Sequence, residues 1–411
     1  MVKENAMKHK VMFTMLVVVA LLLGSTPAIA QEEGPTRSGL RLDAPTFGVR
    51  GPYPVGTMDM VLENEDRPLP VSIWYPALNP DGLAEERIYP LIYPPVFPPL
   101  EAYGKALFEA VPDTENGSYP LVVWSHGFTS FRNANLFFVE HLASWGFVVI
   151  APDHLGMTAA EVANDPDSFW PMYYLAPKDV SLVIDFAEQI NSEGVMSGMI
   201  DLEHIAASGH SAGGITALQA SGGQLDIPGL AERCAVAMET NDCELLVPHF
   251  AEIAELFGLD SVPDGLLPSL PDERIDVVVP MAPDQLLFGE TGLNAVTVPA
   301  LYMVGNADVF VPFSHFEAGF PSLGSENAYM VVFDHANHGV FQDTCETFPA
   351  MVEIGLYDLC AEKVWDKLRA HDLINHYGTA FMLWQLKSDE AAAAVFGQEA
   401  EDFPGVELIE K

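Results

Sequence analysis

The pattern of apolar and polar positions changes near residue 119. Before that point, residues 55–63 and 69–75 predict two strands of a meander, and the proline-rich stretch 76–120 predicts loop with one short helix at 101–109. After it, short continuous apolar runs alternate with stretches that are apolar at helical spacing. The predicted strands are 121–124, 147–151, 205–208, 275–281, 300–304 and 329–333, and the predicted helices are 135–145, 178–191, 211–220, 312–318 and 361–386.

Strands that alternate with helices predict an α/β fold, with a mostly parallel central sheet and helices on both faces. One segment, 221–274, interrupts the alternation and contains an apolar helical stretch at 247–257. We expect a cap-like excursion here that either shapes a substrate pocket or is a structural flap. We therefore predict a single α/β domain over residues 31–411.

The first 30 residues have the features of an export signal. Basic residues at Lys3, Lys8 and Lys10 precede an apolar run at 11–23, and Ala28-Ile29-Ala30 is a small-residue cleavage site. A run of about 13 residues is too short to span a bilayer as a helix. We predict a signal peptide over 1–30 and a mature protein that is secreted or periplasmic.

Charge limits the classes of partner. The formal net charge is −40, and such a chain repels nucleic acid and anionic membrane surfaces. After the signal, no stretch of 18 residues is apolar without a charge or a proline, so stable membrane insertion is not expected. The sequence does not indicate the oligomeric state.

Four cysteines are present in a chain that we expect to be exported. An even count in that setting predicts disulfides, and pairing of sequence neighbours gives Cys234–Cys243 and Cys345–Cys360. Three pairings are possible, and the sequence does not choose between them. A structural zinc site is not expected because the CxxC spacing is missing.

The motif Gly209-His210-Ser211-Ala212-Gly213 matches G-x-S-x-G, and it lies between a predicted strand and a predicted helix. This is the context of a nucleophile elbow, a tight turn whose neighbouring residues must be small. A serine hydroxyl needs a base to take its proton before it attacks. Ser211 is therefore the candidate nucleophile, and a glycine-rich turn without chemistry is the alternative.

An acid and a histidine are expected after later strands, in that order. Asp308 follows the strand at 300–304 and is the candidate acid, with Asp284 as the alternative. The loop after 329–333 contains His335 and His338. We favour His338 as the base because it lies farther from the strand end, from which a loop can bring it to Ser211.

Two backbone N–H groups are needed to hold an oxyanion. One should be the amide of Ala212, which directly follows the nucleophile. The other should come from the loop after the strand at 121–124, where we expect the amide of Phe128. We expect His126 to brace this loop.

Several short segments resemble a known group of enzymes. They resemble the platelet-activating-factor acetylhydrolase family and, equally, the bacterial proteins called predicted dienelactone hydrolases, with secreted cutinase-like polyester hydrolases as more distant relatives. The resemblance covers roughly residues 48–345, and its segments are Gly51–Gly56, Leu69–Pro76, Trp124–Phe128, Arg132, Leu142–Phe147 and Ala151–His154.

This resemblance implies an α/β-hydrolase fold, with Ser211, Asp308 and His338 as the triad and Phe128 and Ala212 as the oxyanion donors. The chain departs from true dienelactone hydrolases, which use a cysteine nucleophile. The acetylhydrolase relatives imply short acyl groups on lipids, and the cutinase-like relatives imply polyesters and lipid esters.

The sequence thus predicts a serine hydrolase that cleaves carboxylic esters of small molecules, lipids or polyesters through an acyl-enzyme, without a metal or other cofactor. Two alternatives are a serine peptidase of the prolyl-oligopeptidase type and a non-catalytic binding protein with this fold. Residues 31–120 are too short for the propeller domain that such peptidases carry, and an intact Ser, Asp and His argue against the binding protein.

Overall fold

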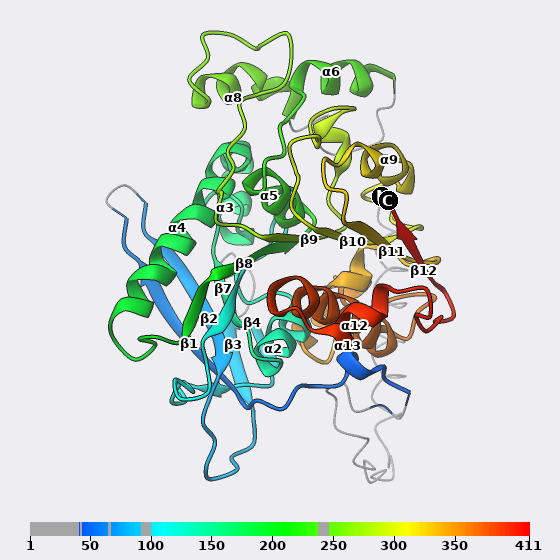
Figure 1. Ribbon diagram of the computed structural model, residues 1–411. Helices are drawn as coiled ribbons and strands as arrows, with labels where there is room; N and C mark the ends of the chain where they lie inside the picture. Colours follow the sequence, from blue (N-terminus) through cyan, green and yellow to red (C-terminus); the bar gives the residue numbers. More distant parts are fainter. Residues whose placement is uncertain (1–40, 42, 65–66, 92–99, 237–245) are drawn as a thin grey trace, which may run out of the picture.

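The computed structural model describes residues 41, 43–64, 67–91, 100–236 and 246–411. Within this part of the chain, ten strands form one sheet in the order β12-β11-β10-β9-β8-β6-β7-β2-β1-β5 (Figure 1). These strands are β1 (Val55–Leu62), β2 (Leu69–Pro76), β5 (Leu107–Phe108), β6 (Tyr119–Ser125), β7 (Val148–Pro152), β8 (Ile200–His210), β9 (Val277–Met281), β10 (Ala300–Gly305), β11 (Ala328–Phe333) and β12 (Val406–Glu410).

The six strands from β11 to β7 in this order run parallel to one another. The pairs β12–β11, β7–β2 and β2–β1 are antiparallel, and the short strand β5 pairs parallel with β1. Parallel strands place their carboxyl ends at one edge, so the loops after β6, β8, β10 and β11 meet there. The predicted α/β class with a mostly parallel sheet is confirmed.

The central strands are apolar throughout because helices cover both faces of the sheet. In β6, Leu121 and Val123 belong to one core cluster with α4 (Met172–Ser192) and α5 (Ala212–Ala220). Val122 and Trp124 belong to the other cluster. That second cluster contains α2 (Leu136–Ser144) and α12 (Lys367–Lys387). Successive residues of a strand point to opposite faces, so a buried strand loses the polar alternation of a half-exposed one.

The predicted helix at 101–109 is wrong. Residues 100–104 form β4 (Leu100–Gly104), which pairs antiparallel with β3 (Arg87–Leu91), and β5 follows β4. Side chains of β4 alternate between buried and exposed, which is the period of a strand with one covered face.

The closing helix α12 begins at Lys367 and not at Ala361 as predicted. Asp366 is its N-cap, because its carboxylate accepts the N–H groups of Leu368 and Arg369. The antiparallel edge strand β12 follows this helix and was not predicted. Among the described residues, none of the helices has the length and apolar character needed to cross a bilayer.

The segment 221–274 forms α6 (Ile227–Val236), a short 3-10 turn at Val247–His249 and α8 (Phe250–Leu256). Figure 1 shows α6 and α8 together beyond α5, away from the sheet. The expected disulfide partner Cys243 lies outside the described residues. The other expected disulfide, Cys345–Cys360, is present.

Candidate active site

Ser211 occupies the sharp turn between β8 and α5. Its backbone has φ 57° and ψ −121°, a strained conformation for a residue with a side chain. The Ser211 N–H donates to the carbonyl of Met281 at the end of β9. A Cβ atom added to Gly213 would lie 1.9 Å from the carbonyl oxygen of Ser125. The glycine is therefore required for α5 to start this close to the end of β6.

Asp308 and His338 come from the loops after β10 and β11 and meet beside this turn. His338 Nδ1 lies 2.6 Å from Asp308 Oδ2. Asp308 Oδ1 accepts the N–H groups of Phe310 at 2.8 Å and Val311 at 2.9 Å. Both members of the pair are buried. Because Nδ1 is engaged by the carboxylate, Nε2 is the nitrogen that remains for a reacting group.

The alternative base, His335, lies elsewhere. Its side chain is 70% exposed and pairs with Asp334 at 2.8 Å on the surface. A positive φ of 57° at His335 carries its side chain away from the sheet before the chain turns back to bury His338.

The alternative acid, Asp284, has a histidine partner of its own. Its Oδ1 lies 3.0 Å from Nδ1 of His315 and accepts the N–H of Leu286. The structure thus pairs His338 with Asp308 and not with Asp284.

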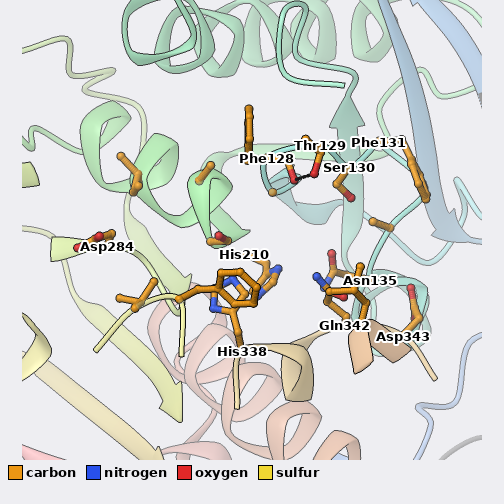
Figure 2. Close-up of a pocket in the computed structure, with 18 of the residues that line it drawn as sticks. Phe128, Thr129, Ser130, Phe131, Asn135, His210, Asp284, His338, Gln342 and Asp343 are labelled. Atoms are coloured by element: carbon orange, nitrogen blue, oxygen red, sulfur yellow. Dashed lines mark hydrogen bonds between the residues drawn. The ribbon is translucent and has the colours of Figure 1, made fainter. Parts of the chain in front are cut away.

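A cavity of about 350 Å³ opens over Ser211. Figure 2 shows Phe128, Thr129 and Ser130 along one side of it, His210 and His338 opposite them, and Asp284 and Asp343 at its two ends. Its apolar lining comes from Phe128, Phe131, Phe169, Met172, Ile215, Phe310, Val311, Phe348, Met351 and Leu359. None of the described lining residues is a lysine or an arginine.

The two expected oxyanion donors border this cavity together with the nucleophile. Phe128 lies in the loop after β6, and its ring packs edge-on against Phe169 at 5.4 Å. Ala212 is the first residue of α5, so its amide belongs to the helix N-terminus, where the helix dipole favours negative charge. His126 braces the loop as expected, with Nδ1 2.8 Å from the carbonyl oxygen of Gly127.

His210, the first variable residue of G-x-S-x-G, is a site residue that the motif does not predict, because the motif leaves this position open. Its ring lies 4.6 Å from the ring of His338 and is fully enclosed. Among the described residues its Nε2 has no hydrogen-bond partner. Burial lowers the pKa of His210 well below its usual value, so this ring stays neutral beside His338.

The described residues of the excursion, 221–236 and 246–274, do not line the cavity. His249 stacks on Trp170 at 5.4 Å and Phe257 packs against Tyr174 at 5.0 Å, so the excursion covers the start of α4. Whether the excursion shapes a substrate pocket or is a structural flap stays a prediction.

The ferulic acid esterase from Streptomyces cinnamoneus superposes with a TM-score of 0.59 at 18% identity, over 87% of this chain and 96% of that one. The protein has the α/β-hydrolase fold.

Two sequence comparisons agree with this fold. The chlorophyllase family model matches residues 99–231, which include both the loop after β6 and Ser211. "Putative esterase YitV" from Bacillus subtilis (strain 168) is 30% identical over 112 residues, which are 26% of this chain and 41% of that protein. The chain thus spans less than half of that relative. The resemblance to acetylhydrolases and predicted dienelactone hydrolases stays a prediction about its subgroup.

Proposed function

We propose that the protein is a serine hydrolase of carboxylic esters, with Ser211, His338 and Asp308 as its triad. The observation that carries the proposal is a strained Ser211 that borders one cavity together with His338, whose Nδ1 is held by the buried carboxylate of Asp308. The similarity to two esterases supports the choice of ester chemistry.

The proposed reaction is a two-step acyl transfer. His338 Nε2 accepts the Ser211 proton as Oγ attacks the ester carbonyl, and Asp308 orients the ring and stabilises its charged form. The amides of Phe128 and Ala212 donate to the oxyanion of the tetrahedral intermediate, and one such donor is worth about 10²–10³ in rate. His338 then protonates the leaving alcohol. In the second step His338 accepts a proton from water as the water attacks the acyl-enzyme, and it returns that proton to Ser211 Oγ as the carboxylic acid leaves.

The lining of the cavity points to uncharged substrates. Its walls are mostly apolar, and the charged side chains that border it include Asp284 and Asp343 but no described cation. An anionic substrate group would enter without a partner, at a large desolvation cost. We therefore expect a neutral diester to be hydrolysed faster than the half-ester that its first cleavage leaves, which product analysis over time measures.

The decisive experiment compares the mature protein with Ser211→Ala on p-nitrophenyl esters with short to long acyl chains. We expect turnover that collapses in the variant, and the chain-length profile then measures the acyl pocket. Cleavage of aminoacyl anilides without any ester turnover would establish the peptidase instead. No turnover of either esters or anilides would support the non-catalytic alternative.

The same proposal places the enzyme outside the cytoplasm, after cleavage near Ala30. The Cys345–Cys360 disulfide supports an oxidising compartment. Residues 1–30 lie outside the described part of the chain. N-terminal sequencing of the exported protein should begin at Gln31, and retention of Met1 in that protein would contradict the export proposal.

A further inference from the structure

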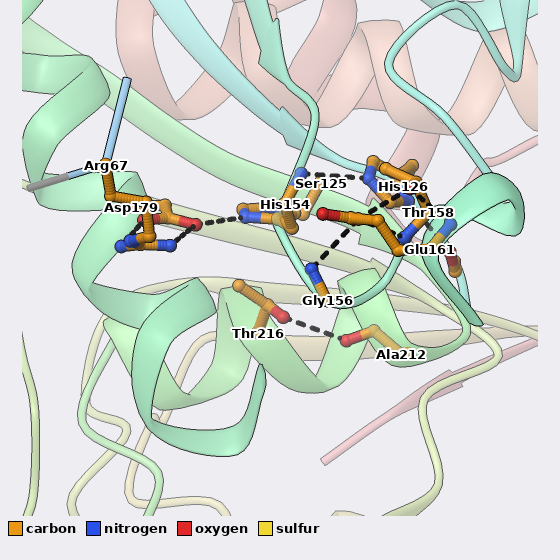
Figure 3. A network of polar contacts seen from close by, with 11 residues as sticks. Arg67, Ser125, His126, His154, Gly156, Thr158, Glu161, Asp179, Ala212 and Thr216 are labelled. Atoms are coloured by element: carbon orange, nitrogen blue, oxygen red, sulfur yellow. Dashed lines mark hydrogen bonds and ion pairs between the residues drawn. The ribbon is translucent and has the colours of Figure 1, made fainter. Parts of the chain in front are cut away.

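A buried polar network contacts Ser125, the last residue of β6, and the loop 126–132 that follows it (Figure 3). His154, two residues beyond β7, is its centre. Its Nδ1 lies 3.0 Å from Asp179 Oδ2, and its Nε2 lies 3.0 Å from Ser125 Oγ. Its backbone N–H also donates to His126 Nε2 at 3.1 Å. His154 thus contacts both the last residue of β6 and the first residue of the loop.

The network is anchored in α4 and beyond it. Asp179, on α4, is fully buried and is held by two guanidinium contacts from Arg67. An enclosed carboxylate needs such a partner, because a bare charge away from water is strongly unfavourable. With Asp179 fixed on a long helix, the ring of His154 is fixed as well.

These contacts determine the tautomer of His126. Since Nε2 accepts the His154 N–H, the proton must lie on Nδ1, which then donates to the carbonyl of Gly127 at 2.8 Å. Burial lowers the pKa of His126 to about 4, which keeps the ring in this neutral form. Through the side chain and the backbone N–H of His154, these contacts connect Asp179 to the peptide group that directly precedes Phe128.

The far end of the loop is held by the neighbour of His154. Asp153 accepts the N–H of Arg132 at 2.7 Å and pairs with its guanidinium. Between the two ends, the N–H of Thr129 donates to the carbonyl of Met157 at 3.0 Å. The backbone on either side of Phe128 is thus attached to the segment that follows β7.

Ser125, His154 and Asp179 also have the composition of a catalytic triad, but they cannot serve as one. All three are fully buried, and none borders the cavity. No substrate can reach Ser125 Oγ, so the contacts of this trio act within the protein.

We propose that His154 is a positioning residue that holds the Phe128 amide where the oxyanion develops. The proposal rests on the proposed function, in which that amide is the second donor. It assigns to the Asp179–His154–Ser125 contacts an effect on the transition state and not on substrate binding.

The first measurement is hydrogen exchange, which needs no substrate. In His154→Ala we expect faster exchange across residues 126–131 than in the wild type. The matched control is His141→Ala, because His141 is also a buried histidine with a hydrogen bond of 2.8 Å to a carbonyl, that of Phe47. Unchanged exchange at 126–131 in His154→Ala, or an equal increase in the control, would overturn the proposal.

The second measurement is ester hydrolysis. We expect kcat to fall about 10- to 100-fold in His154→Ala, with KM within about threefold, because a small misplacement of a donor weakens only the transition-state interaction. A boronic acid that forms a tetrahedral adduct on Ser211 should lose affinity in parallel. His154→Gln, which keeps a hydrogen-bond donor and an acceptor, should recover part of the lost kcat. If His154→Ala does not fold, Ser125→Ala replaces it in both measurements, with the same expected results.

The two proposals fail in different ways. A rise in KM with unchanged kcat would overturn the positioning role, since that pattern reports ground-state binding. If the wild type hydrolyses no ester, but hydrogen exchange at 126–131 is faster in His154→Ala and not in His141→Ala, the esterase proposal is wrong. The role of His154 in holding the loop is then still supported.

Discussion

Asp308→Asn is the substitution whose effect the structure specifies most closely. Asp308 Oδ1 accepts two backbone N–H groups, from Phe310 and Val311, while Oδ2 faces His338 Nδ1 at 2.6 Å. An asparagine that keeps both backbone hydrogen bonds must place its oxygen at the Oδ1 position. Its NH₂ group then faces His338.

The consequence is a reversed histidine tautomer. The amide NH₂ donates to Nδ1, so the imidazole proton moves to Nε2, and Nε2 can no longer accept the Ser211 proton. Turning the amide over would leave the N–H groups of Phe310 and Val311 facing another donor, at about 1–3 kcal/mol each. We therefore expect kcat to fall about 10⁴-fold, as reversal of the tautomer does in serine proteases. This is about 5 kcal/mol of transition-state stabilisation.

The assay is steady-state hydrolysis of a p-nitrophenyl ester near pH 7, with the thermal unfolding midpoint measured alongside. Asp334→Asn is the matched control, since Asp334 also contacts a histidine, the exposed His335. It should keep activity within about twofold, as surface substitutions usually do. A loss of less than tenfold in a folded Asp308→Asn would refute the reasoning, and Asp284→Asn would then be the next variant to assay.

Three further predictions concern stability. Burial raises the pKa of Glu140 to about 7, so the unfolded chain loses this proton at lower pH than the folded protein does, and the free energy of unfolding falls as pH rises from about 4.5 to 7. In urea unfolding across that pH range, Glu140→Gln should lose less stability than the wild type, by up to about 3 kcal/mol. Parallel pH dependences of the two proteins would contradict this. Gly213→Ala should lower both stability and activity, because the new methyl group meets the Ser125 carbonyl, and overpacking of this kind costs about 1–3 kcal/mol. Calorimetry and ester hydrolysis that both match the wild type would contradict this prediction. Replacing Cys345 and Cys360 by serine opens a loop with a sequence separation of 15, which should cost about 3 kcal/mol in denaturant unfolding, and an unchanged midpoint would show that the cross-link does not stabilise the fold.

The strand-helix alternation was readable from the sequence because its causes are local. A strand covered on both faces is apolar at every position, and a nucleophile elbow needs small residues beside the serine. Both features are present in consecutive residues, as in β6 and in Gly209–Gly213. The helix predicted at 101–109 failed because its residues pair with β3, a partner that the local pattern does not reveal.

The sequence by itself determined the class of fold and the order of the candidate serine, acid and histidine. Only the tertiary structure decided that His338, and not His335, meets Asp308, because a positive φ at His335 sends that side chain to solvent. It also decided that His154 lies behind the Phe128 loop. Residues 125, 154 and 179 are far apart in the chain, and they meet only because β6 and β7 are neighbours in register and α4 packs across both. Contacts of this kind depend on strand order and helix packing, which no local pattern encodes.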